Sequence, residues 1–356
     1  MTRLLALAVA VVAVARPFQG RERGAESPAL QATAHANAVV AADGSGDYTT
    51  IQAAIDAVPQ NTRPASPWLI AIRAGTYRER VYVQREKRYV VLVGEDPSRV
   101  VITYDLAATQ AGPGGLPMGT FRTPTVTIDA DDFTAENVTF ENSAGPIGQA
   151  LAIRVDGDRA IFRNCRFLGW QDTMLLNRGR QYFEDVLVTG HVDFIFGAAT
   201  AFFERPRIHV WRSGYITAAS TPEEARFGFV FVNGSITGEP GAMTYLGRPW
   251  RDFAQVTFLN TAMSNAVRAA GWHNWDRPER EKTARFGELG SRGPGANARG
   301  RVTWATRLDP RETLKLSAST VLGGPDGWNP LRLPPHPSTV KAVDAPLPRP
   351  PGSSTP

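Results

Sequence analysis

Two aspartates, Asp172 and Asp193, lie at matching places in a repeated stretch of the chain and have the spacing for shared acid–base chemistry. Asp172 lies eight residues after Asn164, and Asp193 lies eight residues after Asp185, where Asn164 and Asp185 hold one slot of successive repeats. If each repeat is one coil of a stack, equal offsets place the two carboxyl groups about 4.8 Å apart. Stacked carboxylates repel, so one pKa rises while the other stays low, as acid–base or nucleophile–acid chemistry requires.

The neighbours of this pair favour a functional site, although a structural ladder explains the spacing equally well. Gln171 precedes Asp172, and the apolar run Phe194-Ile195-Phe196 follows Asp193. An amide donor beside an acid pair in an apolar wall is typical of an oxyanion site. Stacked aspartates also serve as purely structural ladders, so spacing and neighbours leave both interpretations open.

The elements that position the pair come from a short phrase that recurs through the middle of the chain. Each copy has an aromatic residue (alanine in the first copy, at Ala135), one further residue, then Asn, Asp or Arg, two further residues and an apolar side chain. The third position recurs every 20 to 28 residues, at Asn137, Asn164, Asp185, Arg205, Asn233 and Asn260. Such a period with strand-like alternation is typical of a solenoid. We therefore predict an all-β fold, a single-stranded right-handed parallel β-helix, with Cys165 as a small core residue.

A helix is expected to close the N-terminal end of this solenoid. Thr49 and Thr50 supply N-cap residues ahead of apolar residues at helical spacing, and Pro59 ends the run. Strands are predicted at 68–72, 81–83, 89–93 and 100–104.

The two ends of the chain are expected to lie outside the folded body at 38–330. Arg3 and the twelve apolar residues that follow, which end in an A-x-A pattern, predict a signal peptide at 1–15. This run is shorter than the roughly 20 residues that span a bilayer, so no membrane association is expected after cleavage. Residues 16–37 are predicted to be a linker, and the proline-rich residues 331–356 an extended tail that is either disordered or lies along the surface.

Composition and missing motifs exclude several classes of protein. The single cysteine allows no intrachain disulfide, and the net charge of +5 suits a polyanionic partner. The histidines have no metal-ligand spacing, and G-x-S-x-G, H-E-x-x-H, Walker and C-x-x-C motifs are absent from the sequence. Arginines without interleaved aromatic residues disfavour nucleic acid. The acidic stretch 129–132 is expected to form a turn rather than a calcium site. We expect a monomer without metal or organic cofactor.

Several separate segments of the chain form a specific pattern when taken together. They are Gly75-Thr76-Tyr77-Arg78-Glu79, Asn142-Ser143-Ala144-Gly145-Pro146, Gln149-Ala150-Leu151, Gln171-Asp172-Thr173, Gly190-His191-Val192-Asp193-Phe194-Ile195-Phe196-Gly197, Leu246-Gly247-Arg248-Pro249-Trp250, Gly271-Trp272-His273-Asn274-Trp275 and Gly293-Pro294-Gly295-Ala296. In this order they resemble the pectinesterase (pectin methylesterase) family, carbohydrate esterases built on a parallel β-helix. The resemblance covers about residues 38–310.

The resemblance implies catalytic roles for five residues. Asp193 would be the nucleophile that attacks a galacturonate methyl ester, and Asp172 would protonate the departing methanol and then activate water. Gln171 and Gln149 would donate hydrogen bonds to the oxyanion. Arg248 would hold Asp193 ionised and would also contact substrate.

The resemblance also implies a substrate, a place of action and further binding residues. The protein would be a secreted pectinesterase that converts methyl-esterified homogalacturonan and water to pectate and methanol, outside the cell or in a periplasm. Gln149 and Arg248 would contact the substrate, and so would Thr120, Trp250, Val192 and Phe196. Trp272 and Trp275 are interpreted as either a subsite wall or a packing pair.

Other functions are also compatible with the sequence, and two positions differ from the family pattern. A related esterase for another ester, a calcium-dependent pectate lyase and a non-catalytic polysaccharide-binding protein share much of the pattern. His191 replaces a small polar residue of the family, and Met174-Leu175 stands where relatives often carry an aromatic residue. Because strand alternation places residues 191 and 193 on one face, we hypothesise that His191 tunes the pKa of Asp193.

Overall fold

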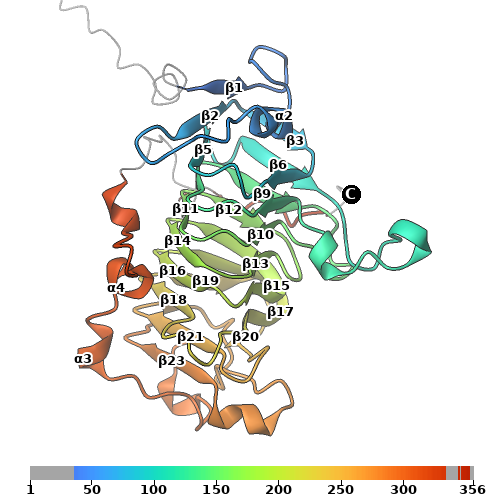
Figure 1. Ribbon diagram of the computed structural model, residues 1–356. Helices are drawn as coiled ribbons and strands as arrows, with labels where there is room; N and C mark the ends of the chain where they lie inside the picture. Colours follow the sequence, from blue (N-terminus) through green and yellow to red (C-terminus); the bar gives the residue numbers. More distant parts are fainter. Residues whose placement is uncertain (1–35, 334–343, 345, 353–356) are drawn as a thin grey trace, which may run out of the picture.

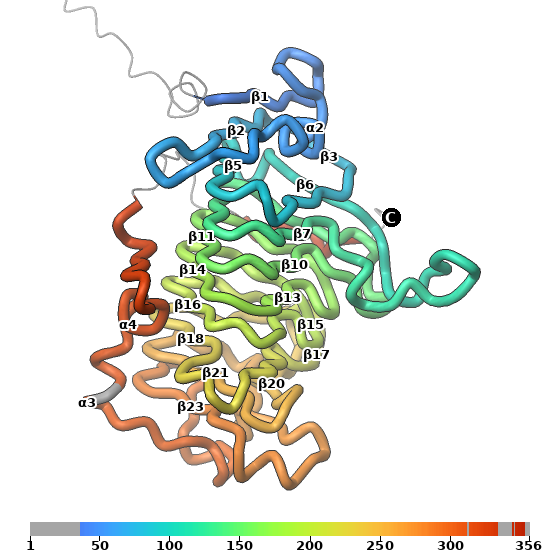
Figure 2. The backbone as a smooth tube through the Cα atoms, viewed as in Figure 1, coloured from blue at the N-terminus to red at the C-terminus, as the bar shows by residue number. Residues whose placement is uncertain are grey.

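The strands of the computed structural model, which describes residues 36–333, 344 and 346–352, pair in parallel to form a β-helix (Figures 1 and 2). Successive coils stack along one axis, and each adds a strand to a growing sheet. The predicted parallel β-helix is therefore confirmed. The predicted signal peptide and all but the last two residues of the predicted linker lie outside the described residues.

One sheet takes a single strand from each coil, in strictly ascending order. Its ten strands are β1 (Ala38–Val40), β2 (Trp68–Ile72), β5 (Val90–Gly94), β8 (Thr134–Glu136), β11 (Ala160–Arg163), β14 (Arg180–Glu184), β16 (Thr200–Glu204), β18 (Phe229–Val232), β21 (Gln255–Leu259) and β23 (Arg285–Leu289).

A second sheet has thirteen strands and turns a corner, because two long strands, β15 (Leu187–Gly197) and β17 (Arg207–Ala219), belong to two faces of the coil. β15 pairs with β12 through its first half and with β13 through its second half. The strands on the first face are β3 (Gly75–Arg78), β6 (Val100–Tyr104), β9 (Thr139–Asn142), β12 (Arg166–Leu168), β19 (Ser235–Gly238) and β22 (Ala262–Met263). Those on the second face are β4 (Val81–Val83), β7 (Val126–Ile128), β10 (Ile153–Val155), β13 (Met174–Leu176) and β20 (Thr244–Gly247).

The repeated Asn, Asp or Arg slot marks a corner where the chain turns through left-handed backbone. Residues 137, 164, 185, 205, 233 and 260 all have φ between 52° and 60°. Asn and Asp tolerate this region better than most residues, which explains their recurrence. Side chains also link coils, since Asn164 Nδ2 donates to Asn137 Oδ1 at 2.6 Å.

The aromatic slot of the same phrase builds a continuous stack inside the helix. The rings of Phe162, Phe183, Phe203, Phe231 and Phe258 stack at centroid separations of 5.0, 4.4, 4.5 and 4.5 Å. Cys165 is fully buried beside this stack, and burial raises the pKa of its thiol to about 12. It is a core residue, as predicted.

The predicted capping helix is confirmed as α2 (Ile51–Asp56). Thr50 Oγ1 accepts a hydrogen bond from the Ala53 N–H, which is ordinary N-cap geometry. The carboxylate of Glu79 accepts two more, from the backbone N–H groups of Ile51 and Gln52 at 2.8 and 2.9 Å. Glu79 therefore fastens the cap to the first coils. In the described part of the chain, no helix has the length and apolarity to cross a membrane.

After the last coil the chain runs back along the outer face of the ten-stranded sheet (Figure 1). We call residues 310–333 the C-terminal strap; it contains α3 (Pro310–Thr313) and α4 (Ala318–Leu322). Apolar residues of α4 pack on Tyr182, Phe202 and Val230. Short 3-10 helices complete the structure: η1 (Pro113–Gly115), η2 (Thr120–Arg122), η3 (Pro278–Lys282), η4 (Ala298–Gly300) and η5 (Pro330–Arg332).

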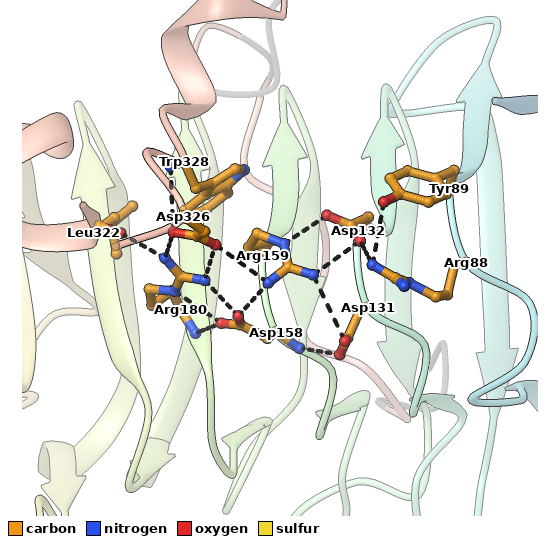
Figure 3. Close-up of polar contacts among 10 residues, drawn as sticks. All are labelled: Arg88, Tyr89, Asp131, Asp132, Asp158, Arg159, Arg180, Leu322, Asp326 and Trp328. Atoms are coloured by element: carbon orange, nitrogen blue, oxygen red, sulfur yellow. Dashed lines mark hydrogen bonds and ion pairs between the residues drawn. The ribbon is translucent and has the colours of Figure 1, made fainter. Parts of the chain in front are cut away.

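Alternating arginines and aspartates fasten the strap to the coils (Figure 3). Asp326 of the strap pairs with Arg180 at 2.7 Å, and Arg180 pairs with Asp158 at 2.6 Å. Arg159 then joins Asp158 to Asp132, with 2.7 Å to each. The stretch 129–132 includes a turn, as expected, and Asp132 points into this network.

Part of the predicted tail is packed on the body. The buried indole of Trp170 donates a hydrogen bond from Nε1 to the carbonyl oxygen of Pro351 at 2.7 Å. Arg163 donates to the carbonyl oxygen of Pro330, the last residue of the predicted body, at 2.7 Å. Proline composition predicts an extended chain, whose carbonyl groups can still accept hydrogen bonds from buried donors, and Pro351 lies on the body in this way.

Candidate active site

The two aspartates of the predicted pair lie on adjacent coils and in the same register. Parallel β-bridges join Gln149 to Gln171 and Gln171 to Val192, so each aspartate follows a residue of one column. The Asp172 N–H donates to the Val192 carbonyl at 3.1 Å. The stacking that equal offsets predict is therefore present.

Both aspartates lie where the backbone departs from strand geometry. Asp172 has φ 62° and Asp193 has φ 50°. Around Asp193 the register of β15 against β17 shifts twice, between 190 and 192 and between 192 and 195. Irregularities of this kind re-aim side chains and are common beside active sites.

Asp193 has an arginine partner and Asp172 has none. Arg248 donates from Nε to Asp193 Oδ1 at 2.9 Å and from Nη2 to Oδ2 at 2.6 Å. Among the described residues, the Asp172 carboxyl group makes no hydrogen bond or ion pair, although the residue is only 8% exposed. A buried carboxyl group without a partner favours its neutral form.

The pKa values of the pair diverge for this reason. Burial, reinforced by the charge of Asp193, raises the pKa of Asp172 well above its usual range, and Arg248 opposes this only partly. Burial also raises the pKa of Asp193 overall, because the hydrogen bonds and charge of Arg248 offset only part of it. Both pKa values therefore lie above the usual range, that of Asp172 well above it, where the sequence predicted that one would stay low. The geometry therefore supports one protonated acid beside one arginine-bound carboxylate.

Two side-chain amides lie in the column that leads to this pair. Gln149 and Gln171 are both half-buried, and among the described residues neither side-chain amide has a hydrogen-bond partner. Their N–H groups are therefore available to a ligand. Donors that are preorganised in this way stabilise developing negative charge on oxygen.

An apolar cluster forms the wall of the site on the outer side of the coils. Leu175, Phe196 and Ala218 are neighbours in register on three successive strands. Leu151 belongs to the same cluster, and Trp250 and Trp275 pack on it. Phe196 meets the edge of Trp250 with ring centroids 5.7 Å apart, and Val192 is half-buried nearby in the column.

Trp272 and Trp275, which the sequence could not assign to a subsite wall or to packing, have different roles. Trp272 is 1% exposed and stacks on Phe286 in the core, so it is a packing residue. Trp275 lies on the cleft side, where it and Trp250 line a cavity of about 490 Å³ together with Arg251, Asp276, Arg277 and Arg280. Only Trp275 is therefore available to a ligand or to the site.

Thr120 lies on η2, at the end of a long loop that protrudes beside the same column (Figure 1). The loop is fastened there, because the Ala108 N–H donates to the Gln149 carbonyl and the Gly119 N–H donates to the Ala108 carbonyl. Thr120 therefore lies on the side of the site formed by Gln149, whose coil precedes those of the two aspartates. Arg248 comes from a coil that follows them.

The hypothesis that His191 tunes Asp193 is not supported. Left-handed backbone at Asp193 breaks the alternation on which the hypothesis depended. The His191 ring packs edge-on against Trp170 at 5.5 Å, and burial lowers the pKa of His191. The determinants of the pKa of Asp193 are burial and Arg248.

The sequence did not single out Tyr215, although the coil register leads to it. Val192 pairs with Tyr215 on β17, and Tyr215 pairs with Tyr245 on β20. Extending the column of Gln149 and Gln171 by one coil therefore locates it. Across the described parts of the chain, no three His, Cys, Asp or Glu residues assemble as a metal site.

The fold is a parallel β-helix that carries two buried aspartates on adjacent coils. A family model described as Pectinesterase matches residues 37–324. The chain belongs to the pectinesterase family.

Curated and solved relatives agree with this assignment. Pectinesterase 31 of Arabidopsis thaliana is 43% identical over 277 residues, which are 76% of this chain and 86% of the relative. The chain spans only 51% of another relative, Pectinesterase 4 of the same plant, at 38% identity over 82% of this chain. Pectin methylesterase from carrot superposes with a TM-score of 0.76 at 30% identity, covering 88% of this chain and 97% of that chain. A pectin methylesterase in complex with a hexasaccharide has a TM-score of 0.71 at 30% identity, covering 83% and 98%.

Proposed function

We propose that this chain hydrolyses the methyl esters of pectin with Asp193 as nucleophile and Asp172 as general acid and base. The observation that carries the proposal is the asymmetry of the pair, in which Arg248 binds Asp193 in a bidentate manner and Asp172 lacks a partner among the described residues. An ionised carboxylate beside a neutral carboxylic acid is the state that nucleophilic attack with acid assistance requires.

In the first half of the reaction, Asp193 attacks the ester carbonyl carbon of a methylated galacturonate. The carbonyl oxygen becomes an oxyanion, to which the free amides of Gln171 and Gln149 donate hydrogen bonds. Collapse breaks the bond to the methoxy oxygen, and Asp172 transfers its proton to that oxygen, so methanol leaves. An anhydride between Asp193 and the galacturonyl group remains.

In the second half, Asp172 is ionised and serves as the base. It takes a proton from a water molecule, whose oxygen attacks the galacturonyl carbonyl carbon. The anhydride bond breaks, Asp193 leaves as a carboxylate and Asp172 is protonated again. The free galacturonic acid then ionises, so the cycle consumes one ester and one water and releases methanol, pectate and a proton.

The substrate is a methyl-esterified homogalacturonan that lies along the outer wall of the coils. Phe196, Val192 and Trp250 line the place of the methyl group and the sugar ring, and Arg248 faces the site. A hexasaccharide is bound by a solved relative at 30% identity. The net charge of +5 favours this polyanion. Thr120 contacts the chain from the protruding loop.

We also propose that the protein acts as a monomer after export. The apolar run at 4–15 and its A-x-A ending support cleavage of a signal peptide at 1–15. The destination is the medium, or the periplasm of a cell with two membranes.

The test is methanol release from highly methylated pectin in EDTA, with wild type and Asp193→Asn compared. We expect metal-independent release by wild type and a loss on the order of 10⁶-fold in the variant, the scale known for removal of a catalytic nucleophile. Asp185→Asn is the matched control, because Asp185 also has left-handed backbone and an arginine partner, Arg205, at 2.8 Å. Methanol release by Asp193→Asn at the rate of Asp185→Asn would refute the nucleophile.

The alternative functions predict different results in the same assay. Dependence on calcium, seen as loss of polysaccharide cleavage in EDTA, would indicate a lyase. Folded wild type that binds pectin and releases no methanol would indicate a binding protein or an esterase for another ester.

A further inference from the structure

The Arg248 guanidinium lies between two aromatic rings. Its central carbon lies 3.9 Å from the centroid of the Tyr215 ring and 3.7 Å from the centroid of the Trp275 ring. Its edge at the same time holds both oxygens of Asp193. Arginine stacks well on aromatic faces while its N–H groups point outward in the plane, so the two kinds of contact are compatible.

Trp275 reaches this position through unfavourable backbone. Its φ is 62°, and Asp276 after it has φ 54°. Left-handed backbone is a genuine outlier for a bulky residue and is energetically unfavourable. Such outliers persist only where the surroundings hold them, and they gather at functional sites.

A short turn and a cluster of rings hold Trp275 in this conformation. The Trp275 N–H donates to Nδ1 of His273 at 2.9 Å, so this nitrogen is unprotonated. The His273 ring lies 5.4 Å from Tyr215 and 5.2 Å from Tyr245, and these two tyrosines stack at 5.3 Å. The same cluster therefore places both rings that contact Arg248.

We propose that Tyr215 and Trp275 form an aromatic clamp that fixes the Arg248 guanidinium in register with the Asp193 carboxylate, and that the His273 turn sets the clamp. These are positioning residues, since they act through Arg248. An arginine side chain without such support samples several rotamers, and both hydrogen bonds to the nucleophile then form for only part of the time. The catalytic consequence rests on the function proposed above.

The clamp also connects the arginine to the substrate wall. Trp275 packs on the apolar cluster of Leu175 and Phe196 and lines the cavity beside Trp250. Arg268 lies near the clamp, with its guanidinium over Tyr245 at 5.2 Å. The other charged or titratable groups around the clamp include Arg248, Asp193, Asp172, His273, Asp276, Arg251, Arg277 and Arg280. Asp276 is 96% exposed and lies 3.9 Å from His273.

The kinetic test compares Trp275→Leu, which removes the aromatic face, with Trp275→Phe, which retains one. We expect Trp275→Leu to lower kcat about tenfold, the scale of one cation–π contact, and Trp275→Phe to recover most of it. The acidic limb of kcat/KM should move to higher pH in Trp275→Leu, because a loosened Arg248 no longer favours the ionised nucleophile. Equal effects of leucine and phenylalanine on both measures would overturn the clamp.

Two further variants separate the clamp from packing. Tyr215→Leu should reproduce the shift of the acidic limb and covers the case in which Trp275→Leu does not fold. Trp250→Leu removes a neighbouring tryptophan of the same wall that does not contact Arg248; it should raise KM and leave the acidic limb in place. An acidic limb that moves in Trp250→Leu as far as in Trp275→Leu would refute a specific role for the clamp.

A spectroscopic measurement tests the clamp without substrate. Ring currents from two flanking rings should shift the Arg248 Hδ resonance upfield, and these protons, unlike Hε, make no hydrogen bond to Asp193 that would oppose the shift; Arg248→Lys is used to assign the resonance. Trp275→Leu should move this resonance back toward that of an exposed arginine. An unshifted wild-type resonance would overturn the clamp even if pectin is hydrolysed, and a shifted resonance in a protein inactive on pectin would uphold the clamp and refute the proposed reaction.

Discussion

Asp172 and Asp193 follow two bridged residues on adjacent coils, yet their surroundings differ in one respect that determines their chemistry. Arg248 makes two hydrogen bonds to the carboxylate of Asp193. The pKa of Asp172 is instead raised by burial and by the negative charge of Asp193. The parallel stack thus brings two aspartate side chains together. Arg248, which follows β20 two coils beyond Asp193, makes their pKa values differ.

The first prediction concerns this inequality. Asp193→Asn removes the negative charge that raises the pKa of Asp172 and leaves Arg248 in place, so the pKa of Asp172 should fall. Carbon-detected NMR titration of the Asp172 carboxyl group measures the change. An unchanged or higher pKa of Asp172 in the variant would contradict the coupling.

The second prediction concerns the pH profile of the wild type. Activity requires ionised Asp193 and protonated Asp172, so kcat/KM should rise with the ionisation of Asp193 and fall with that of Asp172. Because burial raises the pKa of Asp172 well above its usual range, the falling limb should lie above the usual range of an aspartate. Initial rates of methanol release across pH check this. A profile with a single rising limb and no fall would argue against an acid role.

The third prediction concerns the two amides. Gln171→Leu and Gln149→Leu should each lower kcat by about 10²–10³-fold, the usual loss for one oxyanion donor, with a smaller change in KM. Both amides lack protein partners among the described residues, so neither substitution leaves a buried group unpaired. Steady-state kinetics on methylated pectin measure the effects. A rise in KM alone would assign the glutamine to substrate binding.

The fourth prediction concerns acid stability of the strap. Arg180 lowers the pKa of Asp326. Burial alone would raise the pKa of Asp158 and of Asp132, but Arg180 and Arg159 lower that of Asp158 overall, and Arg159 and Arg88 lower that of Asp132. A depressed folded pKa contributes stability that is complete above the unfolded value near 4 and is lost as pH falls below it.

Asp326→Asn should therefore lower stability modestly at pH 7, by at most about 1 kcal/mol because the pair is partly exposed. Below about pH 4 its difference from wild type should shrink, since wild type loses the same contribution there. Urea unfolding at pH 7 and pH 3 measures both. A difference that grows at low pH would contradict the sign of this linkage.

The fifth prediction concerns the aromatic stack. Phe183 is fully buried between Phe162 and Phe203, so Phe183→Ala should cost about 3–5 kcal/mol of unfolding free energy. Phe183→Leu should cost less, because it leaves a smaller cavity. Phe121→Ala, at a ring that is 52% exposed, should change stability by less than about 0.5 kcal/mol. Equal losses at 183 and 121 would contradict the stack.

The period of the repeat was sufficient to predict the fold and to place Asp172 and Asp193. Both follow from register, which a constant offset within each coil carries directly. Arg248 was predicted only from the resemblance to the pectinesterase family. It lies on another coil, and its distance in sequence from Asp193 does not indicate that the two side chains meet.

Other features could not be read from spacing. The alternation used for His191 fails because left-handed backbone at Asp193 is a local departure that residue types do not reveal. The left-handed turn at Trp275 also goes against the preference of its residue type. The packed part of the tail depends on carbonyl groups, which every residue has, so composition carries no signal for it.

The C-terminal strap has a consequence for how the molecule comes apart. In a solenoid each coil contacts only its neighbours, so coils can in principle fray one after another from either end. Here the strap reaches Arg159 and Arg180 through ion pairs and belongs to an apolar cluster that extends to Leu259 and Leu289, across many coils at once. Loss of one coil in this stretch therefore weakens contacts of distant coils. We expect the strap to make these coils unfold together rather than one after another.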